Sequence, residues 1–288
     1  MSAPFRGANR PYPWEQDMTV CIAALCEDFK TIVTASDKMI SNDFVARESG
    51  LTKFAHITEK WAFSFSASDV TPLSEIMRGA HAAFSDHDGT VEDARSKVIK
   101  VYQDIRLKRA EARFLAPRGW NLDQFIKEGL KLLGEMTFTS IERRIHEFDL
   151  GVELLVVGFD SDGIGHIFSV EHPGIAEDRS VPGFHAIGSG SLNAMSSLYQ
   201  RNLNPASYLP PVVYYVYEAK KYAEKNGSVG DETSFSIFRA DGRVEAGRGR
   251  LAILESIWDR VKPRDLDGSM VDGLLKNVEL LKILPETK

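Results

Sequence analysis

The chain has 288 residues, of which 43% are hydrophobic and 26% are charged, as is typical of a globular protein that buries a full core. Its formal net charge of -6 argues against nucleic acid as the main partner, and it lacks the run of about 20 apolar residues that a membrane-spanning helix needs. Cys21 and Cys26 are too few for a disulfide framework, and residues 1–17 contain no apolar signal segment, which favours a cytoplasmic protein. No HExxH or CxxC motif occurs, so we expect no metal site and no cofactor.

The N-terminal part predicts an arm followed by a β-hairpin. Residues 1–18 are polar and contain several prolines, and we interpret them as a leader or a flexible arm. Two β-rich runs follow at about 19–26 and 30–36, and a tight turn at Glu27–Asp28 joins them.

Thr19 opens this hairpin, and Asp37 follows its second strand. A threonine at this place is a candidate nucleophile that becomes the N-terminus of the working protein. Its own α-amino group, with a pKa of about 7.7–8.0, would then take the proton from its hydroxyl. The alternative is that Thr19 is only a β-favouring residue and that Asp37–Lys38 is only a turn.

The next segments predict a strand and then helices. A polar loop over 41–50 leads to a run at 61–66 in which large and small residues alternate, as in a half-buried strand. Thr71 is the expected N-cap of the following helix, and Pro72 is its expected first residue. From there to about residue 149, apolar stripes at helical spacing predict three helical segments that face the core.

After residue 150 the pattern returns to strands. The expected strands are a hairpin over 153–170 that turns at Asp160–Gly163, a short strand at 184–187 and a final hairpin over 234–246. The expected helices are 192–200, 210–225 and two amphipathic helices in the tail, 250–288. Helices and strands are thus segregated along the chain, which favours an α+β fold in which two antiparallel sheets pack face to face with helices outside both.

The run Gly188–Ser191 lies between an expected strand and an expected helix. Glycines allow a sharp turn there, and the helix N-terminus offers unpaired N–H groups to an anion or a developing oxyanion. The run is therefore either a helix cap or part of a reactive site. A phosphate-binding loop is a third interpretation, although no Walker lysine follows and no βαβ unit surrounds the run.

Four landmarks together carry a resemblance to a known family. They are Thr19, Asp37, Lys53 within Lys53–Ile57, and Ala186–Ser191, whose sequence Ala-Ile-Gly-Ser-Gly-Ser is close to that family's Ile-Gly-Ser-Gly-Ser. In their order and spacing the chain resembles a proteasome β-type subunit, a member of the N-terminal-nucleophile (Ntn) hydrolases, and among these the bacterial proteasome-like subunits. The match covers about 19–78 and 150–247.

The resemblance implies the four-layer αββα sandwich of that family over 19–249, with a helical insert at about 90–149 and a C-terminal helical extension at 250–288. It also implies roles for particular residues. Thr19 is the expected nucleophile, Lys53 the cation that lowers its proton affinity, and Asp37 the group that holds the lysine. Ser189 and Ser228 are the expected supports of the threonine.

The sequence departs from the family pattern in three places. Lys225 stands where the family has an aspartate that supports the site, with Glu224 adjacent, so either Glu224 substitutes for it or the support is lost. The family's oxyanion glycine falls on Phe65, and we expect a backbone N–H of Phe65 or Ser66 to serve instead. Met18 and the residues before it must be removed before Thr19 carries a free amine.

The function implied is that of a threonine-type peptidase that hydrolyses peptides or unfolded proteins within a ring or spiral of identical subunits. An ATPase partner is left open, and neither nucleic acid nor a membrane is an expected partner. Thr19 would be exposed either by translation from Met18 followed by removal of that methionine by methionine aminopeptidase, or by autocatalytic cleavage of the leader. Two alternatives remain: a non-proteolytic Ntn amidase, and a catalytically inactive structural ring subunit that retains its leader.

Overall fold

The computed structural model describes residues 19–42, 45–48, 53–84 and 90–262. The expected leader and the expected second helix of the tail lie outside the described residues. The chain divides into two units, Met1–Leu251 and Ala252–Lys288. Helix α7 (Arg248–Val261) begins in the first unit, and both sheets and the candidate site belong to that unit.

The first sheet has five antiparallel strands in the order β10-β1-β2-β11-β12. These strands are β1 (Cys21–Cys26), β2 (Thr31–Asp37), β10 (Phe184–Ile187), β11 (Thr233–Arg239) and β12 (Gly242–Glu245). Both β1 and β2 are buried along their whole length, which explains why their sequences do not alternate between apolar and polar residues. The expected β1–β2 and β11–β12 hairpins are confirmed.

The second sheet is also antiparallel, in the order β5-β6-β7-β8-β9. Its strands are β5 (Phe54–His56), β6 (Trp61–Ala67), β7 (Val152–Phe159), β8 (Gly165–Glu171) and β9 (Ile175–Asp178). A separate pair, β3 (Met39–Asn42) and β4 (Val45–Glu48), lies where the sequence predicts a polar loop. That prediction is wrong, because a ladder of backbone hydrogen bonds does not require an apolar sequence.

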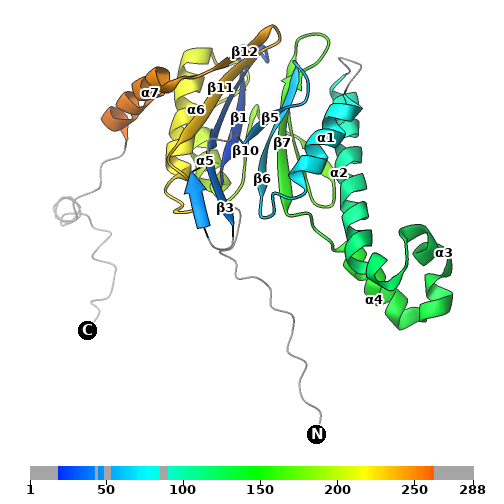
Figure 1. Ribbon diagram of the computed structural model, residues 1–288. Coiled ribbons are helices and arrows are strands. Elements are labelled where there is room, and N and C mark those ends of the chain that lie inside the picture. Colours follow the sequence, from blue (N-terminus) through cyan, green and yellow to red (C-terminus); the bar gives the residue numbers. More distant parts are fainter. Residues whose placement is uncertain (1–18, 43–44, 49–52, 85–89, 263–288) are drawn as a thin grey trace, which may run out of the picture. The chain divides into compact units, whose positions relative to one another are not determined.

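Apolar side chains fill the space between the two sheets, and this core includes Cys21, Leu155 and Ile187. Helices lie on the outer sides of both sheets (Figure 1). On the first sheet these are α5 (Ser191–Gln200) and α6 (Leu209–Ala223), and on the second they are α1 (Leu73–Ala83) and α2 (Val91–Phe114). The chain is therefore α+β with two facing antiparallel sheets, as the sequence predicts.

The region after α2 forms two further helices, α3 (Leu122–Leu133) and α4 (Glu135–His146), preceded by a short 3-10 turn at Ala116–Arg118. They share a small apolar core with the end of α2. The sequence predicts three helical segments up to residue 149, but the described residues of this stretch form four α-helices, because Gly134 ends α3 and begins α4 with φ of 75°.

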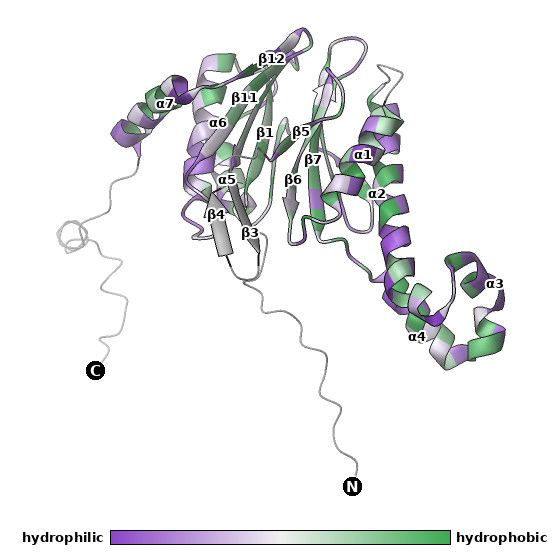
Figure 2. Cartoon of the chain, viewed as in Figure 1, coloured by the Kyte–Doolittle hydropathy of each residue, from purple (hydrophilic) through white to green (hydrophobic). Residues whose placement is uncertain are grey.

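Two local features complete the description of the helices. Pro72, and not Thr71, occupies the N-cap position of α1, because Thr71 is hydrogen-bonded to Asp69 instead. The strands of both sheets are mostly hydrophobic, whereas α2 alternates hydrophobic and hydrophilic residues along its length (Figure 2). Among the described residues, none of the helices combines the length and the apolar character that crossing a membrane requires.

Candidate active site

Four of the expected site residues lie at one edge of the first sheet. Thr19 comes just before β1, Asp37 ends β2, Ser189 follows β10, and Ser228 lies in the loop before β11. Neighbouring strands are antiparallel, so the starts of β1 and β11 lie beside the ends of β2 and β10; Thr233, the first residue of β11, pairs with Asp37. The topology thus brings together residues that are far apart in the sequence.

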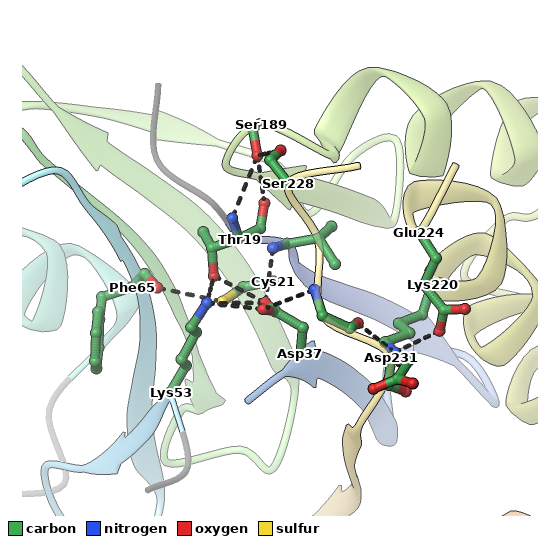
Figure 3. Close-up of polar contacts among 12 residues, drawn as sticks. Thr19, Cys21, Asp37, Lys53, Phe65, Ser189, Lys220, Glu224, Ser228 and Asp231 are labelled. Carbon is green, nitrogen blue, oxygen red and sulfur yellow. Dashed lines mark hydrogen bonds and ion pairs between the residues drawn. The ribbon is translucent and has the colours of Figure 1, made fainter. Parts of the chain in front are cut away.

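Lys53 comes to this edge from the second sheet. It directly precedes β5, and its carbonyl accepts a hydrogen bond of 3.3 Å from the N–H of Phe65. The Lys53 Nζ lies 2.9 and 3.0 Å from the two carboxylate oxygens of Asp37 (Figure 3). The side chains of Lys53 and Asp37 are 5% and 0% exposed, so the two sheets are joined here by a buried ion pair.

The Thr19 hydroxyl contacts both members of this ion pair. Its Oγ1 donates to Asp37 Oδ1 at 2.9 Å and accepts a hydrogen bond from Lys53 Nζ. Asp37 also accepts from the N–H of Val20 at 2.9 Å and from the N–H of Gly230 at 3.4 Å. An ammonium group in contact with a hydroxyl favours the deprotonated oxygen, so Lys53 is placed to lower the proton affinity of Thr19 Oγ1.

The backbone nitrogen of Thr19 has its own polar partners. Its N–H donates to Ser189 Oγ at 3.2 Å, and the Thr19 carbonyl lies 3.3 Å from the same hydroxyl. Ser189 Oγ and Ser228 Oγ are 2.9 Å apart. The two serines therefore lie beside the atom that would become the terminal amine of a chain beginning at Thr19.

Asn226 supports both serines, although it is not among the site residues expected from the sequence. Its Oδ1 accepts from Ser228 Oγ at 2.9 Å, and its Nδ2 donates to the Ser189 carbonyl at 2.8 Å. Glu224, considered above as a substitute for the missing aspartate, does not take that place: its carboxylate pairs with Lys220 and Lys221. The only sequence signal was the turn-forming Asn-Gly-Ser run before β11.

Gly188 allows the chain to approach Thr19 closely. Its φ is +90°, and a Cβ placed there would lie 2.5 Å from Thr19 Cγ2 and 2.5 Å from the Thr19 carbonyl oxygen. Gly190 is the N-cap of α5 but makes no side-chain cap, and its N–H donates to the Thr19 carbonyl at 3.1 Å. The run therefore both begins α5, with Gly190 as its N-cap, and contacts the candidate nucleophile.

The expected oxyanion donors are less well placed. The Phe65 N–H is already engaged by the Lys53 carbonyl at 3.3 Å, so it serves the second sheet. Ser66 is fully buried and pairs in register with Glu153 on β7. Its assignment as an oxyanion donor stays a prediction.

Cys21, two residues after Thr19, is the other potential nucleophile near this edge. Burial raises the pKa of its thiol to about 12, although the positive charge of Lys53 opposes the shift. Its Sγ donates to the Phe65 carbonyl at 3.3 Å. Since the thiolate is the reactive form of cysteine, Cys21 is poorly suited to nucleophilic attack.

The part of the chain that the structure describes contains no cluster of three or more His, Cys, Asp or Glu side chains that would hold a metal ion. No protein-family model matches the sequence, and no curated protein matches it. The functional assignment therefore rests on the geometry of the residues around Thr19.

Proposed function

We propose that this protein is an Ntn hydrolase of the threonine type, with the αββα sandwich of that superfamily. The observation that carries the proposal is the buried contact of the Thr19 hydroxyl with both Lys53 and Asp37. A threonine selected only for its β propensity does not require an ion pair at its hydroxyl, and burying such a pair is costly. The facing sheets and their outer helices also fit that fold.

Cleavage of the Met18–Thr19 bond would convert the Thr19 nitrogen from an amide to a primary amine beside Ser189. In the proposed reaction this amine takes the proton from Thr19 Oγ1, and the oxygen attacks the carbonyl carbon of a substrate amide. The positive charge of Lys53 stabilises the negative charge on Oγ1 as the proton leaves. Asp37 holds Lys53 in place through two contacts.

The tetrahedral intermediate then breaks its carbon–nitrogen bond. The protonated amine of Thr19 gives its proton to the leaving nitrogen, and the acyl group remains on Oγ1 as an ester. A water molecule, deprotonated by the same amine, hydrolyses the ester and restores the hydroxyl. The proposed substrates are peptides or unfolded proteins, whose peptide bonds are amides of the kind that this reaction cleaves.

The proposed enzyme works as a ring or spiral of identical subunits. Helices α3 and α4 expose large apolar side chains, and such surfaces commonly mark interaction sites. They are Ile126 (66% exposed), Leu130 (55%), Leu132 (60%) and Met136 (86%). We expect the tail, residues 250–288, to lie at the interface between subunits, and light scattering of the full chain and of a version ending near Arg248 tests both the oligomer and this role. A monomeric full chain refutes the ring.

The decisive experiment combines intact mass with amide hydrolysis. We expect active protein to begin at Thr19 and to hydrolyse a fluorogenic peptide amide with a burst of acyl-enzyme. Thr19→Ala should remove both the burst and the turnover. Thr34→Ala is the matched control, since Thr34 is a buried threonine on β2 whose hydroxyl contacts only the backbone carbonyl of Ser236 in the contacts described.

The outcomes separate the alternatives. Active protein that still carries Asp17–Met18, or activity that survives in Thr19→Ala, refutes the mechanism. A chain that begins at Thr19 and hydrolyses small amides but no peptides favours the amidase. A chain that retains residues 1–18 and hydrolyses neither favours the structural subunit.

A further inference from the structure

Lys220 is a fully buried lysine that the proposed chemistry does not use. It lies on α6 with an exposed fraction of 0%, one turn after Val216 and two turns after Val212, which are equally buried. Burial lowers its pKa, while the carboxylate of Glu224 opposes that shift. A lysine in such a place needs partners for its ammonium group, because an unpaired buried charge is very costly.

All three hydrogen-bond donors of this ammonium group have an acceptor. Lys220 Nζ lies 2.5 Å from Glu224 Oε1, 2.9 Å from the Gly230 carbonyl and 2.7 Å from the Asp231 carbonyl (Figure 3). Glu224 balances the charge, and the two carbonyls belong to the loop between α6 and β11. The lysine therefore ties this loop to the buried face of α6.

The same loop contacts the candidate active site at two points. The N–H of Gly230, whose carbonyl accepts from Lys220, donates to Asp37 Oδ2 at 3.4 Å. Two residues earlier, the Ser228 hydroxyl lies 2.9 Å from that of Ser189. The position of the loop thus fixes one donor on Asp37 and one hydroxyl beside the Thr19 nitrogen.

We propose that Lys220 is a positioning residue for the hydrolysis proposed above. It holds the backbone of Gly230 and the Ser228 hydroxyl at the site without touching Thr19 or the substrate. The inference rests on the proposed function. Two buried lysines then act around Asp37: Lys53 contacts Asp37 and Thr19 directly, and Lys220 acts through Gly230, whose N–H donates to Asp37. Displacement of a site by as little as 1 Å costs on the order of a hundredfold in rate.

Lys221 provides a matched control. It is the next residue of α6, and its Nζ pairs with the other oxygen of the same carboxylate, Glu224 Oε2, at 2.6 Å. Of the two lysines, only Lys220 donates to the loop carbonyls in the contacts described. Lys220→Met and Lys221→Met therefore each remove one cation from Glu224, and they differ in whether the loop keeps its anchor.

The test measures kcat and KM per active site, counted from the acyl burst, together with hydrogen exchange at the Gly230 amide. For Lys220→Met we expect kcat to fall by about ten- to a hundredfold with KM within about twofold, because the loop moves but the substrate contacts stay. The Gly230 amide should exchange faster. Lys221→Met should match the wild type in all three quantities. A purely structural role would lower the melting temperature without changing kcat per active site.

Wild-type kcat in Lys220→Met, with Gly230 still protected, overturns the proposal, and so does an equal loss in Lys221→Met. If Lys220→Met does not fold, Glu224→Gln replaces it: kcat below that of Lys221→Met supports the anchor, and an equal kcat overturns it. If the wild type has Thr19 exposed but hydrolyses nothing, the proposed function fails. Hydrogen exchange at the Gly230 amide of Lys220→Met then tests only whether Lys220 anchors the loop: faster exchange supports the anchor, and unchanged exchange refutes it.

Discussion

The two sheets each have five antiparallel strands, yet they contribute very differently to the candidate site. The first sheet and its connections supply Thr19, Asp37, Ser189, Ser228 and the Gly230 N–H. The second sheet supplies Lys53 to the reacting groups, and Glu153 on β7 accepts a hydrogen bond of 3.2 Å from the Gly188 N–H. The proposed reacting groups thus come almost entirely from the first sheet, and the second sheet contributes one cation, Lys53.

This asymmetry has an energetic consequence. The first sheet assembles its polar groups through hydrogen bonds to its own loops, whereas Lys53 joins the site through a charge pair buried between the sheets. Removing one partner of such a pair costs about 3–5 kcal/mol, because the other charge stays buried without compensation. Changes in the first sheet should therefore alter chemistry and changes in the second should alter stability, whereas a change of Lys53 should alter both.

The largest expected effect comes from Lys53→Ala, which removes the contribution of the second sheet. We expect kcat per folded molecule to fall by about 10²–10⁴-fold, as for the loss of a positioned acid–base partner. Lys38→Ala is the control, since Lys38 pairs at 3.6 Å with Glu232. Burst kinetics with circular dichroism separate rate from folding. A comparable loss in the control would remove Lys53 from its assigned role.

Asn226→Ala tests whether the first sheet carries the remaining chemistry. The variant loses one hydrogen bond to each of Ser189 and Ser228, so we expect kcat to fall about tenfold, equivalent to about 1.4 kcal/mol. Asn193→Ala removes a comparable contact, from Nδ2 to the Tyr222 carbonyl at 3.4 Å, away from Thr19. Steady-state kinetics of both variants should show the loss in Asn226→Ala alone; unchanged kcat contradicts the assignment.

His185 on β10 allows a test of how the stability of the first sheet depends on pH, because it takes no part in the proposed reaction. Burial and the nearby charge of Arg179 lower the pKa of His185 to about 4. Between pH 6.5 and 4 the unfolded chain therefore holds a proton that the folded chain lacks, so stability falls as the pH falls through that window. From pH 8 to pH 5 we expect a loss on the order of 1–2 kcal/mol in urea unfolding. His185→Gln should lack this part of the pH dependence, and identical curves would refute the attribution.

The smallest effect is expected from Tyr102→Phe on the helical layer of the second sheet. Tyr102 is fully buried on α2, and its hydroxyl donates to the Val152 carbonyl at 2.8 Å. Loss of that hydrogen bond should lower the free energy of unfolding by about 1 kcal/mol and leave kcat unchanged. A decrease in kcat at unchanged stability would mean that residues of the second sheet other than Lys53 also contribute to the chemistry.

The sequence predicted those parts of the site that short motifs carry. Thr19, Asp37, Lys53, Ser189 and Ser228 lie together as the resemblance implied, and the α+β class followed from the order of strands and helices. The strand after Thr19 begins two residues later than expected, because the N–H groups of Thr19 and Val20 bond to Ser189 and Asp37 instead of joining the ladder.

Asn226 and Lys220 were missed for a physical reason. Their roles depend on the path of the loop before β11, and no local pattern specifies which carbonyls and hydroxyls that loop presents. Lys220 did carry a signal, since it follows Val216 by four residues on a helix and so falls on its buried face. The β3–β4 hairpin was missed because its polar sequence resembles a loop.

The hydrogen bonds to the carboxylate of Asp37 join parts of the chain that are far apart in sequence, and this affects when the site can form during biosynthesis. The donors to this carboxylate come from three separate stretches of the chain, and Gly230 is 193 residues away from it in sequence. Contacts of such separation form late, after the loop-closure entropy between them has been overcome. A nascent or partly folded chain therefore lacks the contacts around Thr19, so we expect the proposed hydrolase to become active only after nearly the whole polypeptide has been made and folded.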